Sequence, residues 1–337
     1  MINQIALFAP LVSFFVTLFL LPFWIRKARQ IGLVWEDMNK NGVRGISGSG
    51  GVMVILGFVL GLMTYITYRT FYLHSGNEFF VEILSLFSVI LLLAGLGFMD
   101  DLFGWRKGGL SRRSRIILVF LASIPLIAIN AGKSEIIMPF YGVIDLGLIY
   151  PFFLVPLGII GATTTFNFLA GFNGLEAGQG ILILGALSGV AFLTGSGWLA
   201  AVALCMIFAL LAFLIFNISP AKVFPGDVLT YPVGGLIALM AILGDFERIA
   251  VFFFIPVILE FFLKARGKFV KQSFGLPNED GSLKLRYDKI YSLNHLAIYL
   301  MEKKGIKPTE MKVVLSIWIF QLIIILLGFF IFRAGIF

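Results

Sequence analysis

Apolar runs about as long as a membrane is thick restrict the fold of this chain more than any other feature. About 20 apolar residues in a helix cross the hydrocarbon core of a bilayer. Windows of this length predict ten spans: 4–24, 49–68, 81–99, 115–131, 149–168, 179–194, 198–216, 231–244, 249–264 and 313–333. The eighth is short, which suggests a helix shielded by its neighbours or broken near Pro232 and Gly234-Gly235. The sequence therefore predicts an all-α, polytopic membrane protein, with residues 1–337 in a single integral membrane domain.

The composition agrees with a membrane protein and excludes other classes. Hydrophobic residues make up 59% of the chain, charged residues 13%, and the mean hydropathy is +1.00, values that a soluble domain does not carry. The single cysteine, Cys205, excludes an intrachain disulfide and a thiolate metal cluster. The first span has no basic leader and no small-residue cleavage site, so we expect it to be retained.

Positive charge is divided unevenly between the two faces that these spans define. The formal net charge is +8. In so apolar a chain, the distribution of basic residues indicates first how the chain is oriented in the bilayer, so we expect no nucleic-acid partner. Of the 26 lysines and arginines, 22 fall on one face. The exceptions are Arg69, Lys133, Arg248 and Arg333. By the positive-inside rule the basic face is cytoplasmic, and both termini lie on the other side of the bilayer.

The longest connection, 264–312, is predicted to be a cytoplasmic basic loop. Within it, residues 283–299 carry apolar side chains at near-helical spacing and predict a short amphipathic helix. On the opposite face, residues 136–146 predict a small hairpin that turns at Tyr141-Gly142.

Two adjacent carboxylates, Asp100 and Asp101, end the third apolar run. A helix that simply stops at the water interface is one explanation, because charge is tolerated there. Two successive carboxylates nevertheless repel each other and favour a cation or a set of donors between them. Successive helix positions point about 100° apart, so we do not expect symmetric chelation of one ion. One carboxylate would approach a metal while the other faces substrate or a basic neighbour, for which the candidates are Lys107, Arg113 and Arg115.

A second polar stretch, NFLAGFNGLEAGQG at 167–180, connects two apolar runs. Helix capping and a turn explain Asn173 but not the whole group, because unpaired amides and a carboxylate at this depth are costly. Asn167 would supply a hard oxygen ligand, and Asn173 would hydrogen-bond the edge of a base.

Two further stretches fall on the same predicted face. DMNK at 37–40 precedes a glycine- and serine-rich segment, 45–51, that suits an anionic group, although a flexible loop is the favoured interpretation of this piece alone. VFPGD at 223–227 leads into the eighth span. There Asp227 would cap the helix, and Phe224 would offer an aromatic platform for a nucleobase.

Purely structural explanations of all these stretches would have to coincide on one face. Hard oxygen donors then lie at four points of that face, namely Asp100, Asp101, Asn167 and Asp227. Magnesium typically needs only one or two protein ligands, with substrate phosphates and waters completing its shell. The sequence therefore predicts phosphoryl transfer.

At these motifs the chain resembles a known family. NFLAGFNGLEAGQ, VFPGDVLTY, LGFMDD and DMNK are similar to motifs of the eukaryotic and archaeal UDP-N-acetylglucosamine-dolichyl-phosphate N-acetylglucosaminephosphotransferases. That branch belongs to the polyprenyl-phosphate N-acetylhexosamine-1-phosphate transferase superfamily, within glycosyltransferase family 4. The resemblance, which covers residues 37–287, implies ten spans and a cytoplasmic active site. It also implies transfer of N-acetylglucosamine-1-phosphate from UDP-N-acetylglucosamine to a polyprenyl or dolichyl phosphate, and a homodimer is common in the superfamily.

The resemblance also implies roles for individual residues. Asn167 and Asp227 would hold magnesium, with manganese a candidate substitute, and the acidic pair at 100–101 matches a pair whose division of labour is disputed. Asn173 and Phe224 match positions that hydrogen-bond and stack on uracil. The other substrate-binding candidates are Met38 and Gly171 at the base pocket, Arg115 near the phosphates, Lys40 and Glu176, and Arg266, Lys268 and Lys271 in the basic loop.

Two departures from the family leave the sugar open. Eukaryotic members carry a polar residue at the position of Gly104. They also carry an Arg/His-rich motif, which recognises the N-acetyl group of the sugar, at the position of residues 266–273. His295 is a further candidate there, with an interfacial role as its alternative. The same transfer with another N-acetylhexosamine donor is therefore an alternative function. A transporter is a second one, which the lack of an internal repeat and the clustering of charge at one boundary disfavour.

The predicted mechanism is a one-step displacement in which Asp100 orients or deprotonates the lipid phosphate. The rival is a covalent aspartyl intermediate. Isotope exchange between UMP and the UDP-sugar without lipid acceptor would distinguish the two.

Overall fold

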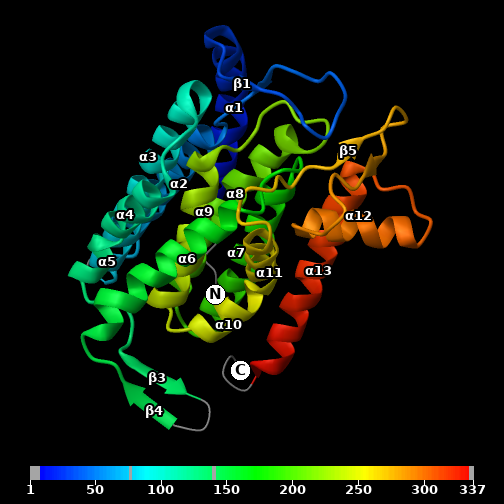
Figure 1. The fold of residues 1–337 in the computed structure, drawn as a ribbon. Coiled ribbons are helices and arrows are strands. Elements are labelled where there is room, and N and C mark those ends of the chain that lie inside the picture. The colour runs from blue at the N-terminus through cyan, green and yellow to red at the C-terminus, as the bar shows by residue number, and fades with distance from the viewer. Residues whose placement is uncertain (1–7, 76–77, 139–141, 334–337) are drawn as a thin grey trace.

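The computed structural model describes residues 8–75, 78–138 and 142–333 and is mostly helical (Figure 1). Its helices are α1 (Phe8–Ile31), α2 (Gly51–Phe71), α3 (Phe80–Lys107), α4 (Arg112–Ala122), α5 (Ile124–Ala128), the π-helical turn η2 (Tyr150–Leu154), α6 (Val155–Asn167), α7 (Leu175–Leu193), α8 (Gly197–Asn217), α9 (Asp227–Leu243), α10 (Glu247–Phe253), α11 (Ile255–Arg266), α12 (Leu293–Lys303) and α13 (Glu310–Ile331). Its strands form three antiparallel pairs: β1 (Val34–Trp35) with β2 (Ile46–Ser47), β3 (Glu135–Met138) with β4 (Gly142–Asp145), and β5 (Leu276–Pro277) with β6 (Leu283–Lys284).

Six helices of the described ranges are long and apolar enough to cross a bilayer, namely α1, α2, α3, α7, α8 and α13. The other four predicted spans coincide with shorter or interrupted helices. α4 ends and α5 begins at Ser123, η2 runs directly into α6, α9 has 17 residues, and α10 and α11 are separated at Phe254. The chain is therefore a polytopic integral membrane protein, and the count of ten spans stays a prediction.

α9 lies inside the bundle, in contact with α3, α6 and α7 (Figure 1). Of its 17 residues, 15 are buried, so protein rather than lipid surrounds this short helix. The predicted shielding is confirmed, whereas the alternative of a break is wrong, because the helix continues through Pro232. Gly234 and Gly235 instead allow close packing. A β-carbon at Gly234 would lie 2.6 Å from Ala162 O, and one at Gly235 would lie 2.3 Å from Leu93 Cδ1.

The two ends of the helix bundle carry different pairs of β-strands. β3 and β4 lie at the same end as α10, whereas β1 and β5 lie at the opposite end (Figure 1). The predicted hairpin is confirmed by the pairing of Glu135–Met138 with Gly142–Asp145, although the turn residue Tyr141 is outside the described residues. This separation of the ends locates the candidate site, because every polar stretch singled out above lies toward β1 and β5.

The predicted amphipathic helix over 283–299 is wrong in its first half. Leu283 belongs to β6, and its N–H donates to Pro308 O at 2.8 Å, a backbone partner distant in sequence. α12 begins only after Ser292, whose hydroxyl accepts the His295 N–H at 3.1 Å as an N-cap. A local cap and a tertiary hydrogen bond therefore override the apolar spacing.

The glycine-rich segment 45–51 is packed against the segment 223–227. The Phe224 N–H donates to Ser47 O at 2.7 Å, and the Gly50 N–H donates to Phe224 O at 2.9 Å. A β-carbon at Gly50 would lie 2.5 Å from Val223 Cγ2. The interpretation of 45–51 as a flexible loop is therefore wrong, because residues 46–51 are buried in this contact.

Candidate active site

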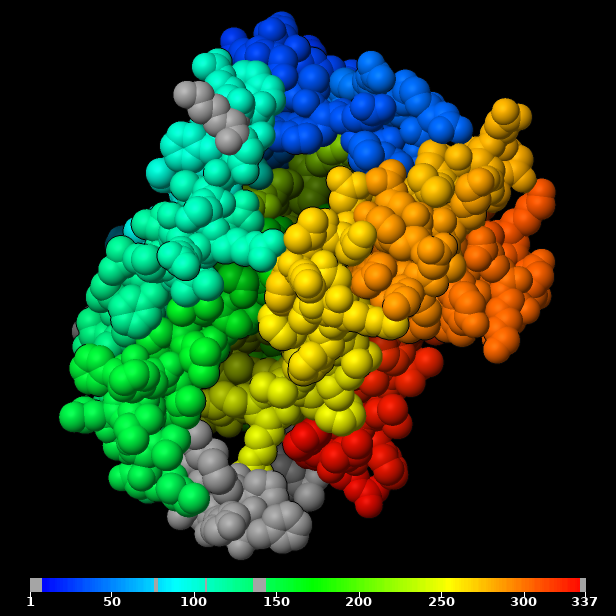
Figure 2. Space-filling model, viewed as in Figure 1, coloured from blue at the N-terminus to red at the C-terminus, as the bar shows by residue number. Residues whose placement is uncertain are grey.

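The molecule is hollowed toward the end that carries β1 and β5 (Figure 2). Blue and cyan atoms of the N-terminal part border the hollow on one side, yellow and orange atoms border it on the other, and yellow-green atoms lie at its bottom. The Arg112 guanidinium donates to Phe269 O at 3.0 Å and lies over the Phe269 ring at 5.7 Å, so α4 and the segment after α11 are in contact.

Asp100, near the end of α3, is buried among donors. Its Oδ2 lies 2.5 Å from Arg115 Nε and accepts the Tyr231 hydroxyl at 3.1 Å. Its Oδ1 accepts the Leu110 N–H at 2.7 Å and Arg115 Nη2 at 3.1 Å. Arg115, one of the basic neighbours predicted, pairs with Asp100, and a planar guanidinium suits a carboxylate in this way.

Asp101 points in another direction, toward the N-terminus of α9. Its Oδ1 accepts the Asp227 N–H at 2.8 Å, and its Oδ2 accepts the Val228 N–H at 3.4 Å. Gly226 leaves room for this contact, because a β-carbon there would lie 2.2 Å from Asp101 Oδ2. Asp101 therefore caps α9 from a different helix, and the expectation that the two carboxylates diverge agrees with the geometry.

Asp227 and Asn167 lie beside this junction. The carboxyl of Asp227, the first residue of α9, is close enough to that of Asp100 to share a hydrogen bond. One helical turn later, Thr230 Oγ1 donates to Asn167 Oδ1 at 3.1 Å. The four predicted catalytic residues are therefore neighbours. We call Asp100, Asp101, Asp227 and Arg115 the acidic cluster.

A second group of polar side chains joins three distant segments. Asn173 Nδ2 donates to Asp37 Oδ2 at 2.9 Å and to Glu310 Oε2 at 3.3 Å. Lys40 Nζ lies 2.6 Å from Asp37 Oδ2 and 2.5 Å from Glu310 Oε2. Burial alone would lower the pKa of Lys40, but its hydrogen bonds to the two carboxylates raise it above the ordinary value. We call Asp37, Lys40, Asn173 and Glu310 the amide cluster.

Asn217, at the end of α8, joins the loop that follows Asn173 to the segment that leads into α9. Its Oδ1 accepts the Gly174 N–H at 3.0 Å, and its Nδ2 donates to Val223 O at 2.9 Å. This single side chain fixes the loop of Asn173 against the segment of Phe224, the two residues predicted to contact a base. Sequence analysis did not single out Asn217, because an asparagine at a helix end has an ordinary capping explanation.

Sequence analysis also missed Glu310 and Asn39. Glu310 opens an apolar helix, where the helix dipole alone explains an acidic residue. Asn39 lies inside the DMNK motif itself, and its Nδ2 donates to Gly171 O at 2.6 Å while its Oδ1 accepts the Gly275 N–H at 3.0 Å. Asn39 could therefore have been predicted from the DMNK motif. Glu310 could not, because its role becomes visible only in the folded chain.

Comparison with known proteins shows the family of this chain. The profile described as glycosyl transferase family 4 matches residues 83–245. A protein of Saccharolobus solfataricus that carries the provisional name UDP-N-acetylglucosamine-dolichyl-phosphate N-acetylglucosaminephosphotransferase is 36% identical over 311 residues, which cover 91% of each chain. The chain belongs to glycosyl transferase family 4.

Two further relatives of this family 4 transferase have other sources. The UDP-N-acetylglucosamine-dolichyl-phosphate N-acetylglucosaminephosphotransferase of Dictyostelium discoideum is 30% identical over 285 residues, covering 73% of this chain and 67% of the relative. The phospho-N-acetylmuramoyl-pentapeptide-transferase of Halalkalibacterium halodurans is 27% identical over 344 residues, covering 98% of both. The family 4 match includes the acidic cluster and Asn173, whereas Lys40 and Glu310 lie outside it.

Two predicted substrate-binding residues of the family 4 chain, Met38 and Phe224, are half-buried. Glu176, in the first turn of α7, is buried, and its carboxylate accepts the Gly171 N–H together with its own. Glu176 therefore closes the loop that carries Asn173.

Two of the predicted basic residues at and after the end of α11 contact tyrosine rings of the basic loop. Arg266, Lys268 and Lys271 are exposed. Lys271 Nζ lies 4.8 Å from the centre of the Tyr287 ring, and Arg266 lies 6.0 Å from that of Tyr291. A pocket of about 280 Å³ opens beside Lys271 and these tyrosines. In the described chain the structure thus groups Lys271 with aromatic side chains rather than with Asp227.

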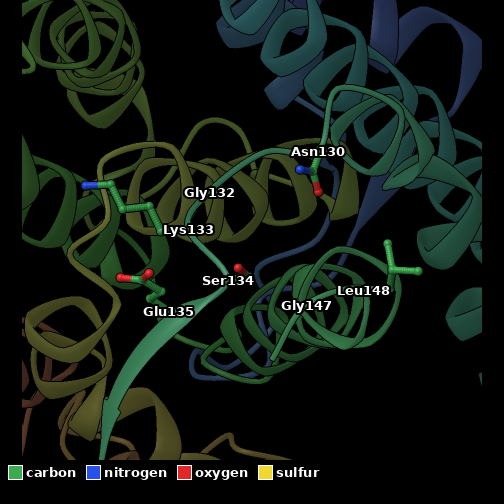
Figure 3. Close-up of a pocket in the computed structure, with 7 residues that line it drawn as sticks. All are labelled: Asn130, Gly132, Lys133, Ser134, Glu135, Gly147 and Leu148. Atoms are coloured by element: carbon green, nitrogen blue, oxygen red, sulfur yellow. The ribbon is translucent and has the colours of Figure 1, made fainter. Parts of the chain in front are cut away.

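A larger pocket lies at the other end of the family 4 chain, where β3 begins (Figure 3). Its volume is about 550 Å³, and Asn130, Lys133 and Glu135 are among its lining residues. Lys133 Nζ pairs with Asp245 Oδ2 at 3.0 Å, and hydrogen bonding to this carboxylate raises the pKa of Lys133. The residues that line this pocket include none of the predicted site residues.

Proposed function

We propose that this chain transfers N-acetylglucosamine-1-phosphate from UDP-N-acetylglucosamine to a polyprenyl phosphate such as dolichyl phosphate. The products would be a pyrophosphate-linked lipid sugar, which starts a lipid-linked oligosaccharide, and UMP. The observation that carries the proposal is the junction of α3 with α9, where Asp100, Arg115 and Asp227 meet. The names of the archaeal and Dictyostelium relatives support the same reaction.

The proposed chemistry is a one-step displacement. A lipid phosphate with a second pKa of about 6 is largely dianionic near neutral pH and needs little base assistance. One of its oxygens attacks the phosphorus that carries the sugar. The bond from that phosphorus to the oxygen of the UMP phosphate breaks, and UMP leaves as an anion. The protein has to hold two anions in line and neutralise them, rather than to supply a nucleophile.

Asp100 is proposed to orient Arg115 in this reaction. Its oxygens already accept from Arg115, Leu110 and Tyr231, so they are poorly placed to remove a proton from substrate. A guanidinium has five N–H donors, so Arg115 keeps others for a phosphate. This favours orientation over deprotonation, the two roles that the sequence left open for Asp100.

Asn167 and Asp227 are proposed to hold a magnesium ion, for which manganese would substitute. The donor set fits this ion, because it offers one carboxylate and one amide oxygen and lacks soft ligands. Within the described residues no group of three or more His, Cys, Asp or Glu side chains is arranged to hold a metal by itself. Substrate phosphates would have to complete the shell. When bound, the ion would neutralise the charge that develops on the pyrophosphate.

The nucleotide would bind at the amide cluster. Asn173 would hydrogen-bond the uracil edge, Phe224 would stack on the ring, and the backbones of Met38 and Gly171 would complete the pocket. Lys40 and Glu176 would fix its walls. This assignment rests on Asn217, which holds the Asn173 loop against Val223.

The sugar would extend toward the basic loop, 264–312, and its Arg266, Lys268 and Lys271. These side chains are exposed. Because residues 266–273 depart from the Arg/His-rich motif of the eukaryotic members, another N-acetylhexosamine donor is the alternative. A proposed arrangement of ten spans, with the basic face toward the cytoplasm by the positive-inside rule, would put the site within reach of soluble UDP-sugars.

The test is transfer of radiolabelled N-acetylglucosamine phosphate from the UDP-sugar to polyprenyl phosphate by purified, lipid-reconstituted protein. We expect product that requires magnesium and disappears in Asp227→Ala. Reconstituted protein that binds the UDP-sugar but never forms lipid-linked product would overturn the proposal. Labelled UMP that exchanges into UDP-N-acetylglucosamine without lipid acceptor would replace the one-step route by a covalent intermediate.

A further inference from the structure

Five donors converge on the carboxylate of Glu310, the first residue of α13. Its Oε1 accepts the Asn173 N–H at 2.9 Å and Asn39 Nδ2 at 3.5 Å. Its Oε2 accepts Ser219 Oγ at 2.7 Å, Lys40 Nζ at 2.5 Å and Asn173 Nδ2 at 3.3 Å. The side chain is 7% exposed. A buried carboxylate with this many donors from three separate segments stabilises their relative positions.

The partners of Asn173 determine which way its amide points. An ionised carboxylate only accepts hydrogen bonds, so Asp37 Oδ2 and Glu310 Oε2 both require the NH2 group of Asn173. Each carboxylate takes one of its two hydrogens. The Oδ1 atom is then the end of the amide that remains to meet a ligand, and the amide cannot rotate by 180° without facing oxygen with oxygen.

We propose that Glu310 and Asp37 are positioning residues that make the site selective for uracil by presenting Asn173 Oδ1 to the base. The inference rests on the proposed function, in which a UDP-sugar binds here. Uracil carries a hydrogen on N3 and so donates to an amide oxygen. Cytosine has an acceptor lone pair at N3, so it would face Asn173 Oδ1 acceptor to acceptor, a buried mismatch that a polar site rejects strongly.

Lys40 compensates the negative charges of Asp37 and Glu310. Its ammonium lies between Asp37 Oδ2 at 2.6 Å and Glu310 Oε2 at 2.5 Å. Without this cation the two carboxylates would repel each other. Lys40 therefore stabilises the close approach of Asp37 and Glu310 on which the orientation of Asn173 depends.

The experiment compares binding of UDP and CDP to full-length protein in lipid nanodiscs by calorimetry. Glu310→Gln keeps the shape of the side chain but adds an N–H donor, which can pair with Asn173 Oδ1. We expect wild-type protein to prefer UDP, and Glu310→Gln to reduce the ratio of the two Kd values by about tenfold or more. In transfer assays KM for the UDP-sugar should rise more than kcat falls, since the reacting phosphates are not touched. The matched control is Glu302→Gln on the exposed side of α12, which should keep both Kd values.

Asp37→Asn provides the second variant, because it alters the other carboxylate that holds Asn173. Loss of selectivity in either folded variant supports the proposal. Unchanged selectivity in both variants, with unfolding temperatures that match wild type, overturns it, and so does wild-type protein that binds CDP as tightly as UDP. The proposed function fails separately: selective UDP binding without any lipid-linked product would remove the reaction and leave the positioning role standing.

Discussion

Asp101 of α3 and Asp227 of α9 are joined by a hydrogen bond from the Asp227 N–H to Asp101 Oδ1 at 2.8 Å. A helix usually takes its N-cap from the residue that precedes it, but here Gly226 precedes the helix and the cap comes from a different span. The carboxylate of one helix thus fixes the orientation at which the next acidic residue is presented. The adjacent aspartates Asp100 and Asp101 therefore have different structural roles. Asp100 forms an ion pair with Arg115, whereas Asp101 caps the N-terminus of α9.

Removal of the cap should weaken the fold more than removal of its charge. Asp101→Ala should cost about 0.5–2 kcal/mol of unfolding free energy, whereas Asp101→Asn keeps an acceptor for the Asp227 N–H and should stay near wild type. Thermal unfolding of both purified variants, followed by tryptophan fluorescence, checks this. Equal destabilisation by the two substitutions would contradict a capping role.

Gly226→Ala should disturb the same contact by steric overlap. A β-carbon at Gly226 would lie 2.2 Å from Asp101 Oδ2, and the residue has φ +73°. Gly305→Ala is a matched control, because its φ is +70° but its β-carbon would meet nothing within 4 Å. Gly226 also has ψ 169°, a region that an alanine adopts only at a cost of about 1–3 kcal/mol, so we expect a larger loss of stability and of transfer activity in Gly226→Ala than in Gly305→Ala. Equal losses would mean that both the overlap and the backbone strain relax freely.

Arg115→Gln should be severe because it leaves Asp100 without its cation. The Asp100 side chain is 1% exposed and that of Arg115 is 31% exposed. Removal of one partner from a largely buried pair should cost about 2–4 kcal/mol of unfolding free energy and lower kcat by about a hundredfold or more. Arg113→Gln, on an exposed position of the same helix, is the control and should change both quantities little. Comparable effects at the two positions would show that general positive charge, not the pair, matters.

His295 should make the stability of the protein depend on pH below neutrality. Its Nε2 lies 3.2 Å from Phe274 O, and its Nδ1 accepts the Tyr291 N–H at 3.4 Å, so the folded protein holds a neutral ring. Burial lowers the pKa of His295, and the nearby charges of Lys264 and Arg286 act in the same direction. The unfolded chain then binds more protons below its own His pKa of about 6.5, so stability is present above that value and is lost as the pH falls below it.

His295→Gln tests this pH dependence, because a glutamine can still donate to Phe274 O but does not titrate. Thermal unfolding of wild type between pH 5 and 8 should show a lower melting temperature on the acidic side, with a smaller change in the variant. Identical profiles for both proteins would exclude His295 as the titrating group.

The sequence predicted the helices well because the bilayer imposes their length. Apolar runs such as 51–71 and 310–331 need no tertiary information to be recognised. Element boundaries were less accurate wherever a distant partner decides them. Leu283 is the clearest case, since its hydrogen bond to Pro308 O makes it a strand residue although its spacing favoured a helix.

The residues of the candidate site could be predicted where the type and local position of a single side chain indicate a function. Asp100, Asp227 and Asn167 were singled out because charge and amides at the ends of apolar runs are costly without partners. Glu310 was not found, because its meaning depends on contact with Asn173, 137 residues earlier in the chain. The tasks of Asp100 and Asp101 likewise depend on how α9 approaches α3, which no local pattern records.

The position of Glu310 has a consequence for biosynthesis. Translation and membrane insertion deliver α13 last among the described helices, so the amide cluster lacks the Glu310 carboxylate until α13 has been made. A nascent or truncated chain that already contains Asp37, Lys40 and Asn173 would hold these groups without their common partner. The proposed nucleotide pocket would therefore form only after α13 has been inserted, and chains that lack α13 would not sequester nucleotide.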